Sequence, residues 1–147
     1  MNYSPIVIFA YNRPDHLKKT LNSLKKVDYI NESELFIYCD GPKKGSSKST
    51  NDKIREVAFI VNNIDWHNKV TVVISKKNKG LKKSIIDGVT EIISIHKKVI
   101  VLEDDLEFSK DFLRYMNYCL DKYENHNDIY HISGYNYNFN SSLPYVY

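Results

Sequence analysis

Three consecutive carboxylates follow a short apolar run late in the chain. Residues 99–102 are Val, Ile, Val and Leu, and Glu103, Asp104 and Asp105 come directly after them. An unbroken apolar run rich in β-branched residues is typical of a strand covered on both faces, as in a parallel sheet. Adjacent like charges at the end of a buried strand need a counter-charge, and carboxylates without His or Cys suit a hard cation such as Mg²⁺ or Mn²⁺. We therefore expect a metal that holds substrate phosphates; the alternative is that Asp104 caps the next helix and the other acids are solvated.

Other polar residues follow the remaining predicted strands. Arg13 comes after the first strand, Asp40 after the second, and Asn78 and Gly80 after the third. Parallel strands bring their carboxyl ends to one edge of a sheet, so these residues are expected to line a single crevice with the acids. For Arg13 the alternative is a surface side chain at a helix start. For Asp40 local evidence favours an ordinary Asp-Gly turn.

Five lysines surround the third of these strand ends, at positions 76, 77, 79, 82 and 83. Most runs of this kind are solvated faces. Here the run also reaches the start of a predicted helix, where phosphate groups bind readily.

Bulk composition excludes several classes of protein. The chain has 147 residues, enough for one domain with a real core, and a net charge of +3, too small to indicate nucleic-acid binding. Its two cysteines, Cys39 and Cys119, form no CxxC pair and are interpreted as reduced core thiols. No apolar stretch approaches the roughly 20 residues of a membrane span, and the apolar N-terminal part is too short for a signal peptide. We expect a cytoplasmic protein.

Apolar periodicity predicts alternating strands and helices. Strands are expected at 5–10, 34–39, 69–75, 99–102 and 129–133. Helices are expected after Pro14, at 51–63, after Gly80 and at 109–124, with a mobile loop at 42–50. This order predicts an α/β protein, a three-layer α/β/α sandwich around a mostly parallel sheet.

Four motifs at the predicted strand ends resemble those of the GT-A glycosyltransferases. They are Ile-Phe-Ala-Tyr-Asn-Arg-Pro, Cys-Asp-Gly, Asn-Lys-Gly-Leu and Val-Leu-Glu-Asp-Asp-Leu-Glu, in this order along the chain. The resemblance covers residues 5–136. It is greatest to the bacterial sugar transferases akin to family 2 and to the N-acetylglucosaminyltransferase that starts complex N-glycans.

The resemblance implies roles for the candidate residues. Glu103, Asp104 and Asp105 match the family's Asp-x-Asp-type motif, with Asp105 as the direct ligand of Mn²⁺ or Mg²⁺ and Glu103 beside it. Arg13 and Asp40 match positions that hold the nucleotide, Asp40 facing a base that is usually uracil. Asn78 and Gly80 match the turn near the ribose and diphosphate. The implied partners are a UDP-sugar donor and a saccharide or glycoconjugate acceptor.

The chain also departs from the family. Residues 85 and 86 are both Ile, where family 2 usually has Arg and Asn, so a phosphate-binding role of that helix is not supported. Residues 1–134 are expected to form the nucleotide-sugar-binding domain, and 135–147 to begin a truncated acceptor-side segment. The catalytic base of inverting members lies beyond that point. Two alternatives are a non-catalytic nucleotide-sugar-binding fragment and a sugar nucleotidyltransferase, which would need glycines after the first strand that residues 11–14 lack.

Overall fold

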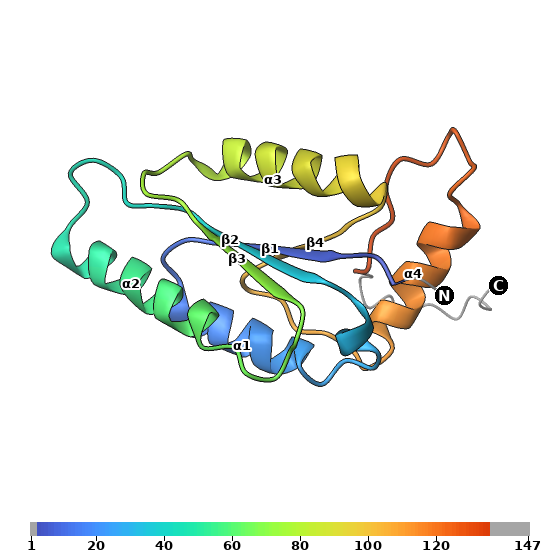
Figure 1. Ribbon diagram of the computed structural model, residues 1–147, viewed down its shortest axis with the longest axis horizontal. Coiled ribbons are helices and arrows are strands. Elements are labelled where there is room, and N and C mark those ends of the chain that lie inside the picture. Colours follow the sequence, from blue (N-terminus) through green and yellow to red (C-terminus); the bar gives the residue numbers. More distant parts are fainter. Residues whose placement is uncertain (1–2, 136–147) are drawn as a thin grey trace, which may run out of the picture.

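Strands and helices alternate along the chain in the computed structural model, which describes residues 3–135 (Figure 1). The strands are β1 (Ile6–Ala10), β2 (Leu35–Cys39), β3 (Val70–Ile74) and β4 (Ile100–Glu103). The helices are α1 (Pro14–Leu24), α2 (Lys48–Asn62), α3 (Leu81–His96) and α4 (Phe112–Lys122), with a short 3-10 turn, η1 (Ile30–Glu32), before β2.

The four strands form one parallel sheet in the order β3-β2-β1-β4. Ile8 in β1 lies opposite Ile37 in β2 on one side and Leu102 in β4 on the other. Helix α3 covers one face of this sheet, and α1, α2 and α4 lie on the other face (Figure 1). The three-layer sandwich with a parallel sheet that the sequence predicts is therefore confirmed.

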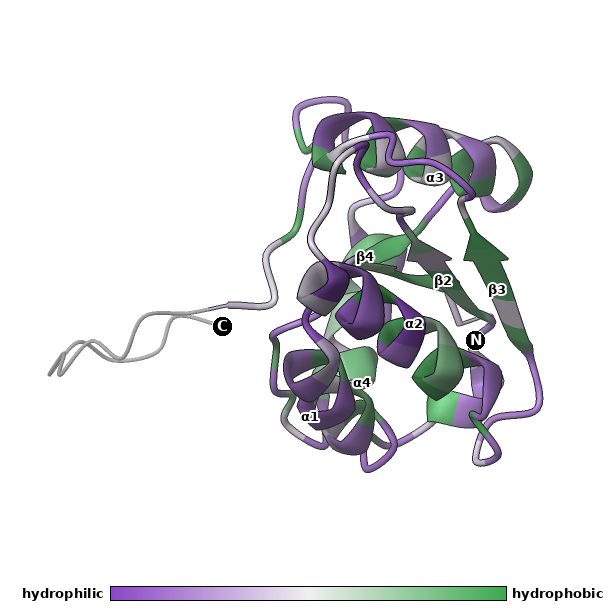
Figure 2. Cartoon of the chain, turned by 90° about the vertical axis from the view of Figure 1, so that its left-hand side faces the viewer, coloured by the Kyte–Doolittle hydropathy of each residue, from purple (hydrophilic) through white to green (hydrophobic). Residues whose placement is uncertain are grey.

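The core lies mainly between the sheet and the layer of α1, α2 and α4. All five residues of β1 are buried, which fits a central strand covered on both faces. Leu17, Leu21 and Leu24 of α1 recur at helical spacing and are buried against the sheet together with Leu113 of α4. Figure 2 shows the hydrophobic strands enclosed between α3 and the other helices. Burial of each such side chain stabilises the folded state by about 1.5–3 kcal/mol. Packing on this face therefore fixes the positions of the strands and of their ends.

The expected strand at residues 129–133 is wrong. These residues are in neither a strand nor a helix, and Tyr130 is 93% exposed. Ile132 packs against the core, and the carbonyl oxygen of Ser133 accepts a hydrogen bond from the Tyr115 hydroxyl at 3.3 Å. The segment is thus held by side-chain contacts that include α4. Of the β-branched and aromatic residues in this segment, Ile132 packs on the core and Tyr130 does not.

The prediction that the acidic strand is covered on both faces is also wrong. Ile100 and Leu102 of β4 are buried, whereas Val101 between them is 44% exposed. Within residues 3–135, β4 is an edge strand, and α3 contacts the neighbouring β1. An apolar run alone does not reveal whether a strand is central or at an edge.

Both cysteines are buried and free, as the sequence predicts for core thiols. Burial, together with the nearby negative charge of Asp104, raises the pKa of the Cys39 thiol to about 12. Cys39 is therefore protonated at neutral pH and unsuited to act as a nucleophile. Within residues 3–135, no helix combines the length and hydrophobicity that crossing a bilayer requires.

Candidate functional site

The connections that follow the four strands meet at one edge of the sheet. Because all strands are parallel, each carboxyl end points to this edge. Backbone hydrogen bonds extend the pairing into the connections: the Asp40 N–H donates to the Ala10 carbonyl at 3.0 Å, and the Ser75 N–H donates to the Cys39 carbonyl at 2.9 Å. The predicted site residues lie on these connections or at the strand ends themselves.

Arg13 bridges two of the three acids. Its Nη1 donates to Oδ2 of Asp105 at 2.8 Å, and its Nη2 donates to Oδ1 of Asp104. The Asp104 side chain is only 4% exposed, against 35% for Asp105 and 45% for Arg13. The counter-charge that the acidic cluster needs is thus supplied, in this structure, by a guanidinium from the connection after β1.

The electrostatics of Asp104 depend on this contact. Burial raises the pKa of its carboxyl group above the ordinary value, the positive charge of Arg13 lowers it, and the negative charge of Asp105 raises it again. The positive charge of Arg13 therefore offsets part of the effect of burial and favours the ionised form of Asp104. The position between the two aspartates is suited to positive charge.

Two hydroxyl groups of α1 hold the acidic connection in place. The Leu106 N–H donates to Oγ1 of Thr20 at 3.0 Å, and the Phe108 N–H donates to Oγ of Ser23 at 2.8 Å. The sequence interpretation did not identify either residue. The signal available in the sequence was the position of Thr20, three residues after Leu17 and next to Leu21, on the apolar side of the helix. In the structure Thr20 is fully buried.

Asp40 organises a second cluster at the same edge. Its Oδ1 accepts the N–H groups of Gly41 at 2.9 Å and Lys79 at 2.8 Å, and its Oδ2 accepts that of Gly80 at 2.9 Å. Asn78 donates from Nδ2 to the Gly41 carbonyl at 3.0 Å. Gly80 is the N-cap of α3 with a φ of 81°, a conformation that favours glycine, and has no side chain of its own for capping. Asp40 therefore satisfies backbone donors at the start of α3, beyond the simple Asp-Gly turn.

The predicted residues thus fall into two groups. Arg13, Asp104 and Asp105 meet at β1 and β4, and Asp40, Asn78 and Gly80 meet at β2 and β3. The ends of β2 and β4 are two strand spacings apart, about 10 Å. Glu103 is exposed at the end of β4 and contributes to neither set of hydrogen bonds.

The acidic side chains at this edge can be compared with the ligands that a metal ion prefers. Among residues 3–135, no group of three or more His, Cys, Asp or Glu side chains could hold a metal ion. Mg²⁺, however, is commonly held by one or two carboxylates together with substrate phosphates. Asp104 and Asp105 converge on one cation, the guanidinium, and offer only oxygen atoms. This donor set fits a hard cation that shares its coordination with a bound phosphate group.

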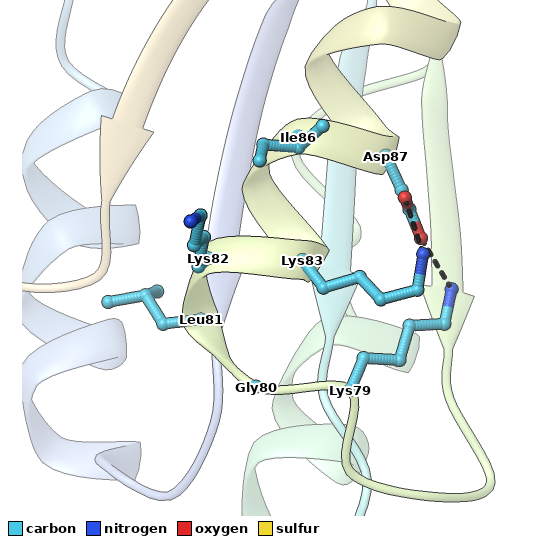
Figure 3. Close-up of a pocket in the computed structure, with 7 residues that line it drawn as sticks. All are labelled: Lys79, Gly80, Leu81, Lys82, Lys83, Ile86 and Asp87. Carbon is cyan, nitrogen blue, oxygen red and sulfur yellow. Dashed lines mark hydrogen bonds and ion pairs between the residues drawn. The ribbon is translucent and has the colours of Figure 1, made fainter.

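A surface pocket of about 470 Å³ lies beside the second group, at the start of α3. Figure 3 shows Lys79 and Lys83 reaching the same carboxylate, that of Asp87, while Leu81, Lys82 and Ile86 line the rest. The Lys83–Asp87 and Lys79–Asp87 distances are 3.0 and 3.8 Å. Two of the five lysines in the basic run are thus paired with a carboxylate within the chain.

Comparison with solved structures identifies the fold. S. aureus TarS, residues 1–349, aligns with a TM-score of 0.57 and 21% identity, covering 82% of this chain and 33% of that one. A mannosyltransferase from Pyrobaculum calidifontis, solved in complex with GDP-Man and Mn²⁺, aligns with a TM-score of 0.54 and 16% identity, covering 80% of this chain and 33% of that one. The chain thus spans about a third of the length of these two structures, and the fold it shares with them is the GT-A fold.

Sequence comparison identifies the family. No curated protein matches the chain significantly. The resemblance to the N-acetylglucosaminyltransferase therefore stays a prediction. The family model described as glycosyl transferase family 2 matches residues 6–144, which is nearly the whole sequence. This chain belongs to glycosyl transferase family 2.

Proposed function

We propose that the chain binds a nucleotide-diphospho-sugar through a divalent metal ion, for transfer of the sugar to a saccharide or glycoconjugate acceptor. The observation that carries this proposal is the convergence of Asp104 and Asp105 on a single cation at the carboxyl edge of the sheet. A nucleotide diphosphate carries several negative charges, and it becomes a good leaving group only when those charges are neutralised. Mn²⁺ or Mg²⁺, when bound, supplies part of that neutralisation.

The residues of the first group have distinct roles in this proposal. Asp105, the more exposed of the two aspartates, holds the metal ion, and Glu103 lies at the same strand end. Asp104 is nearly buried and orients Arg13 through the hydrogen bond that its Oδ1 accepts from Nη2. The guanidinium of Arg13 has the fork geometry that matches phosphate oxygens.

The second group is proposed to hold the nucleoside. Asp40 uses its two oxygens for three backbone N–H groups, which leaves about one of roughly four acceptor positions for the edge of a base. We propose that the ribose and diphosphate pass beside Asn78 and Gly80. We propose uracil as the base, and so UDP-sugar as the donor. The GDP-Man bound by the Pyrobaculum protein makes guanine the base to compare.

The acceptor side and the catalytic base are proposed to lie outside residues 3–135. Residues 1–134 would then form the donor-binding domain, and 135–147 would begin the acceptor-side segment. All but Tyr135 of that segment lie outside the described residues. A cytoplasmic location stays a prediction, as does the alternative that this chain binds the donor without transferring sugar.

The proposal is tested by thermal denaturation with UDP-glucose, UDP-N-acetylglucosamine, GDP-mannose or ADP, each with Mn²⁺ or with EDTA. We expect the UDP-sugars with Mn²⁺ to raise Tm, because a ligand that binds only the native state stabilises it by mass action. EDTA should remove the shift. A larger shift with GDP-mannose would change the base but keep the metal site, whereas no metal-dependent shift with any nucleotide would contradict the proposal.

Asp40→Asn tests the assignment of the base. We expect UDP to bind about 1–3 kcal/mol more weakly, because an amide in place of one carboxylate oxygen leaves polar groups mispaired. ADP, which lacks the uracil edge, should lose much less. Titration calorimetry of both nucleotides with Mn²⁺ measures the difference, with Asp52→Asn on the exposed side of α2 as a control for the charge change. Equal losses for UDP and ADP would reduce Asp40 to a residue that only shapes the loop.

A further inference from the structure

The guanidinium of Arg13 occupies the position between the two aspartates that a metal ion would need. It contacts one oxygen each of Asp104 and Asp105, and it comes from a different connection of the sheet, 91 and 92 residues away in sequence. A cation that binds Asp105 from the same side must compete with this ion pair. Arg13 is itself 45% exposed, so its side chain has free space into which it can turn.

We propose that Arg13 is an internal counter-ion that competes with the divalent metal for Asp105 and is released towards the diphosphate when metal and nucleotide bind together. This inference rests on the proposed function and adds to it an order of contacts within the site. In the ligand-free protein the guanidinium neutralises the acidic pair. In the loaded protein the metal takes over that neutralisation, and Arg13 exchanges one carboxylate oxygen for a phosphate oxygen.

The unequal burial of the two aspartates supports this exchange. Asp104 has a side chain that is 4% exposed, and an unpaired charge there is costly, so its bond to Nη2 is the one expected to persist. The Asp105 side chain is 35% exposed, and its bond to Nη1, at 2.8 Å, can open to water at lower cost. Arg13 would thus pivot about Asp104 and uncover Asp105.

Competition and simple phosphate binding predict different Mn²⁺ affinities for one variant, Arg13→Ala. If Arg13 only binds phosphate, Arg13→Ala leaves the affinity for Mn²⁺ alone unchanged. If Arg13 competes with the metal, Arg13→Ala binds Mn²⁺ more tightly in the absence of nucleotide. The coupling between Mn²⁺ and UDP binding should also become weaker in Arg13→Ala. In this variant there is no guanidinium that metal binding could release towards the diphosphate.

The experiment titrates the 147-residue chain with Mn²⁺ in the absence of nucleotide. The concentration of free Mn²⁺ is measured by electron paramagnetic resonance. We expect Arg13→Ala to bind Mn²⁺ about tenfold more tightly than wild type, the effect of removing one charge-assisted contact. Arg55→Ala is the matched control. Arg55 pairs with Asp52 on the exposed side of α2, so the same change in net charge should leave the affinity for Mn²⁺ nearly unchanged.

Arg13→Lys keeps the experiment decisive if Arg13→Ala does not fold. A lysine retains the charge but cannot bridge both aspartates with a planar fork, so we expect Mn²⁺ affinity between those of wild type and Arg13→Ala. Equal or weaker Mn²⁺ binding by the folded variants would overturn the inference. If wild type still gives the metal-dependent UDP shift, the proposed function stands in that case; absence of the shift in wild type contradicts the function itself.

Discussion

Asp105→Ala is expected to abolish the stabilisation of this protein by Mn²⁺ together with UDP. Asp105 is the partly exposed member of the acidic pair, and its Oδ2 faces the same position as Oδ1 of Asp104. Removing it leaves, beside Arg13, only the buried carboxylate of Asp104, which already pairs with the guanidinium. At a ligand concentration about 100 times Kd, binding stabilises the native state by about 2.7 kcal/mol, and we expect all of this to be lost.

The measurement is Tm with and without Mn²⁺ and UDP, in wild type and the variant. Glu107→Ala is the matched control, because Glu107 is an exposed carboxylate on the same connection and its removal changes the net charge equally. Most of the shift should survive in Glu107→Ala. Equal shifts in wild type and Asp105→Ala would remove Asp105 from the metal site and leave Glu103 as the remaining predicted ligand.

Local pattern was sufficient to predict most of the fold. The buried run of β1 and the leucines of α1 at helical spacing both appear where the sequence places them. The failures have a common cause, which is that burial depends on neighbours in space. Val101 lies in an apolar run but at the edge strand, and residues 129–133 contain β-branched and aromatic side chains but pair with no strand.

The sequence could predict which residues lie at this edge of the sheet, but not which of them contact one another. Placing Arg13, Asp40, Asn78, Gly80 and the acids at one edge required only the alternation of strands and helices. That Arg13 would bridge Asp104 and Asp105 required the strand order, in which β1 lies next to β4. The sequence interpretation assigned the counter-charge to a metal because the sequence alone does not show which basic side chain from another connection lies beside the acids.

The close approach of two connections at Gly41 could not be predicted from the dipeptide Asp-Gly. A Cβ atom at this position would lie 2.4 Å from the carbonyl oxygen of Ser75 and 2.7 Å from the backbone N and C atoms of Lys77. These are backbone atoms, which cannot turn aside as a flexible side chain could. The absence of a side chain at Gly41 therefore lets the connection after β2 pack on the connection after β3, which in turn brings the Lys79 and Gly80 N–H groups to Asp40.

Gly41→Ala is accordingly expected to lower both stability and nucleotide binding. We expect the free energy of unfolding to fall by about 3 kcal/mol, the upper part of the usual range for overpacking, and Tm to fall by roughly 10 °C. Because the displaced connection carries Asn78 and Gly80, UDP should also bind more weakly to the fraction that remains folded. Thermal denaturation and titration calorimetry below the midpoint measure the two effects separately.

Gly45→Ala separates this steric effect from ordinary glycine strain in the same connection. Gly45 has a φ of 80°, and a Cβ atom added there would have no neighbouring atom within 4 Å, so alanine meets open space. Its only cost is the left-handed conformation, about 1–2 kcal/mol, and UDP affinity should be retained. If Gly41→Ala were no more destabilising than Gly45→Ala and bound UDP as wild type does, the packing of the two connections would not be what positions Asp40.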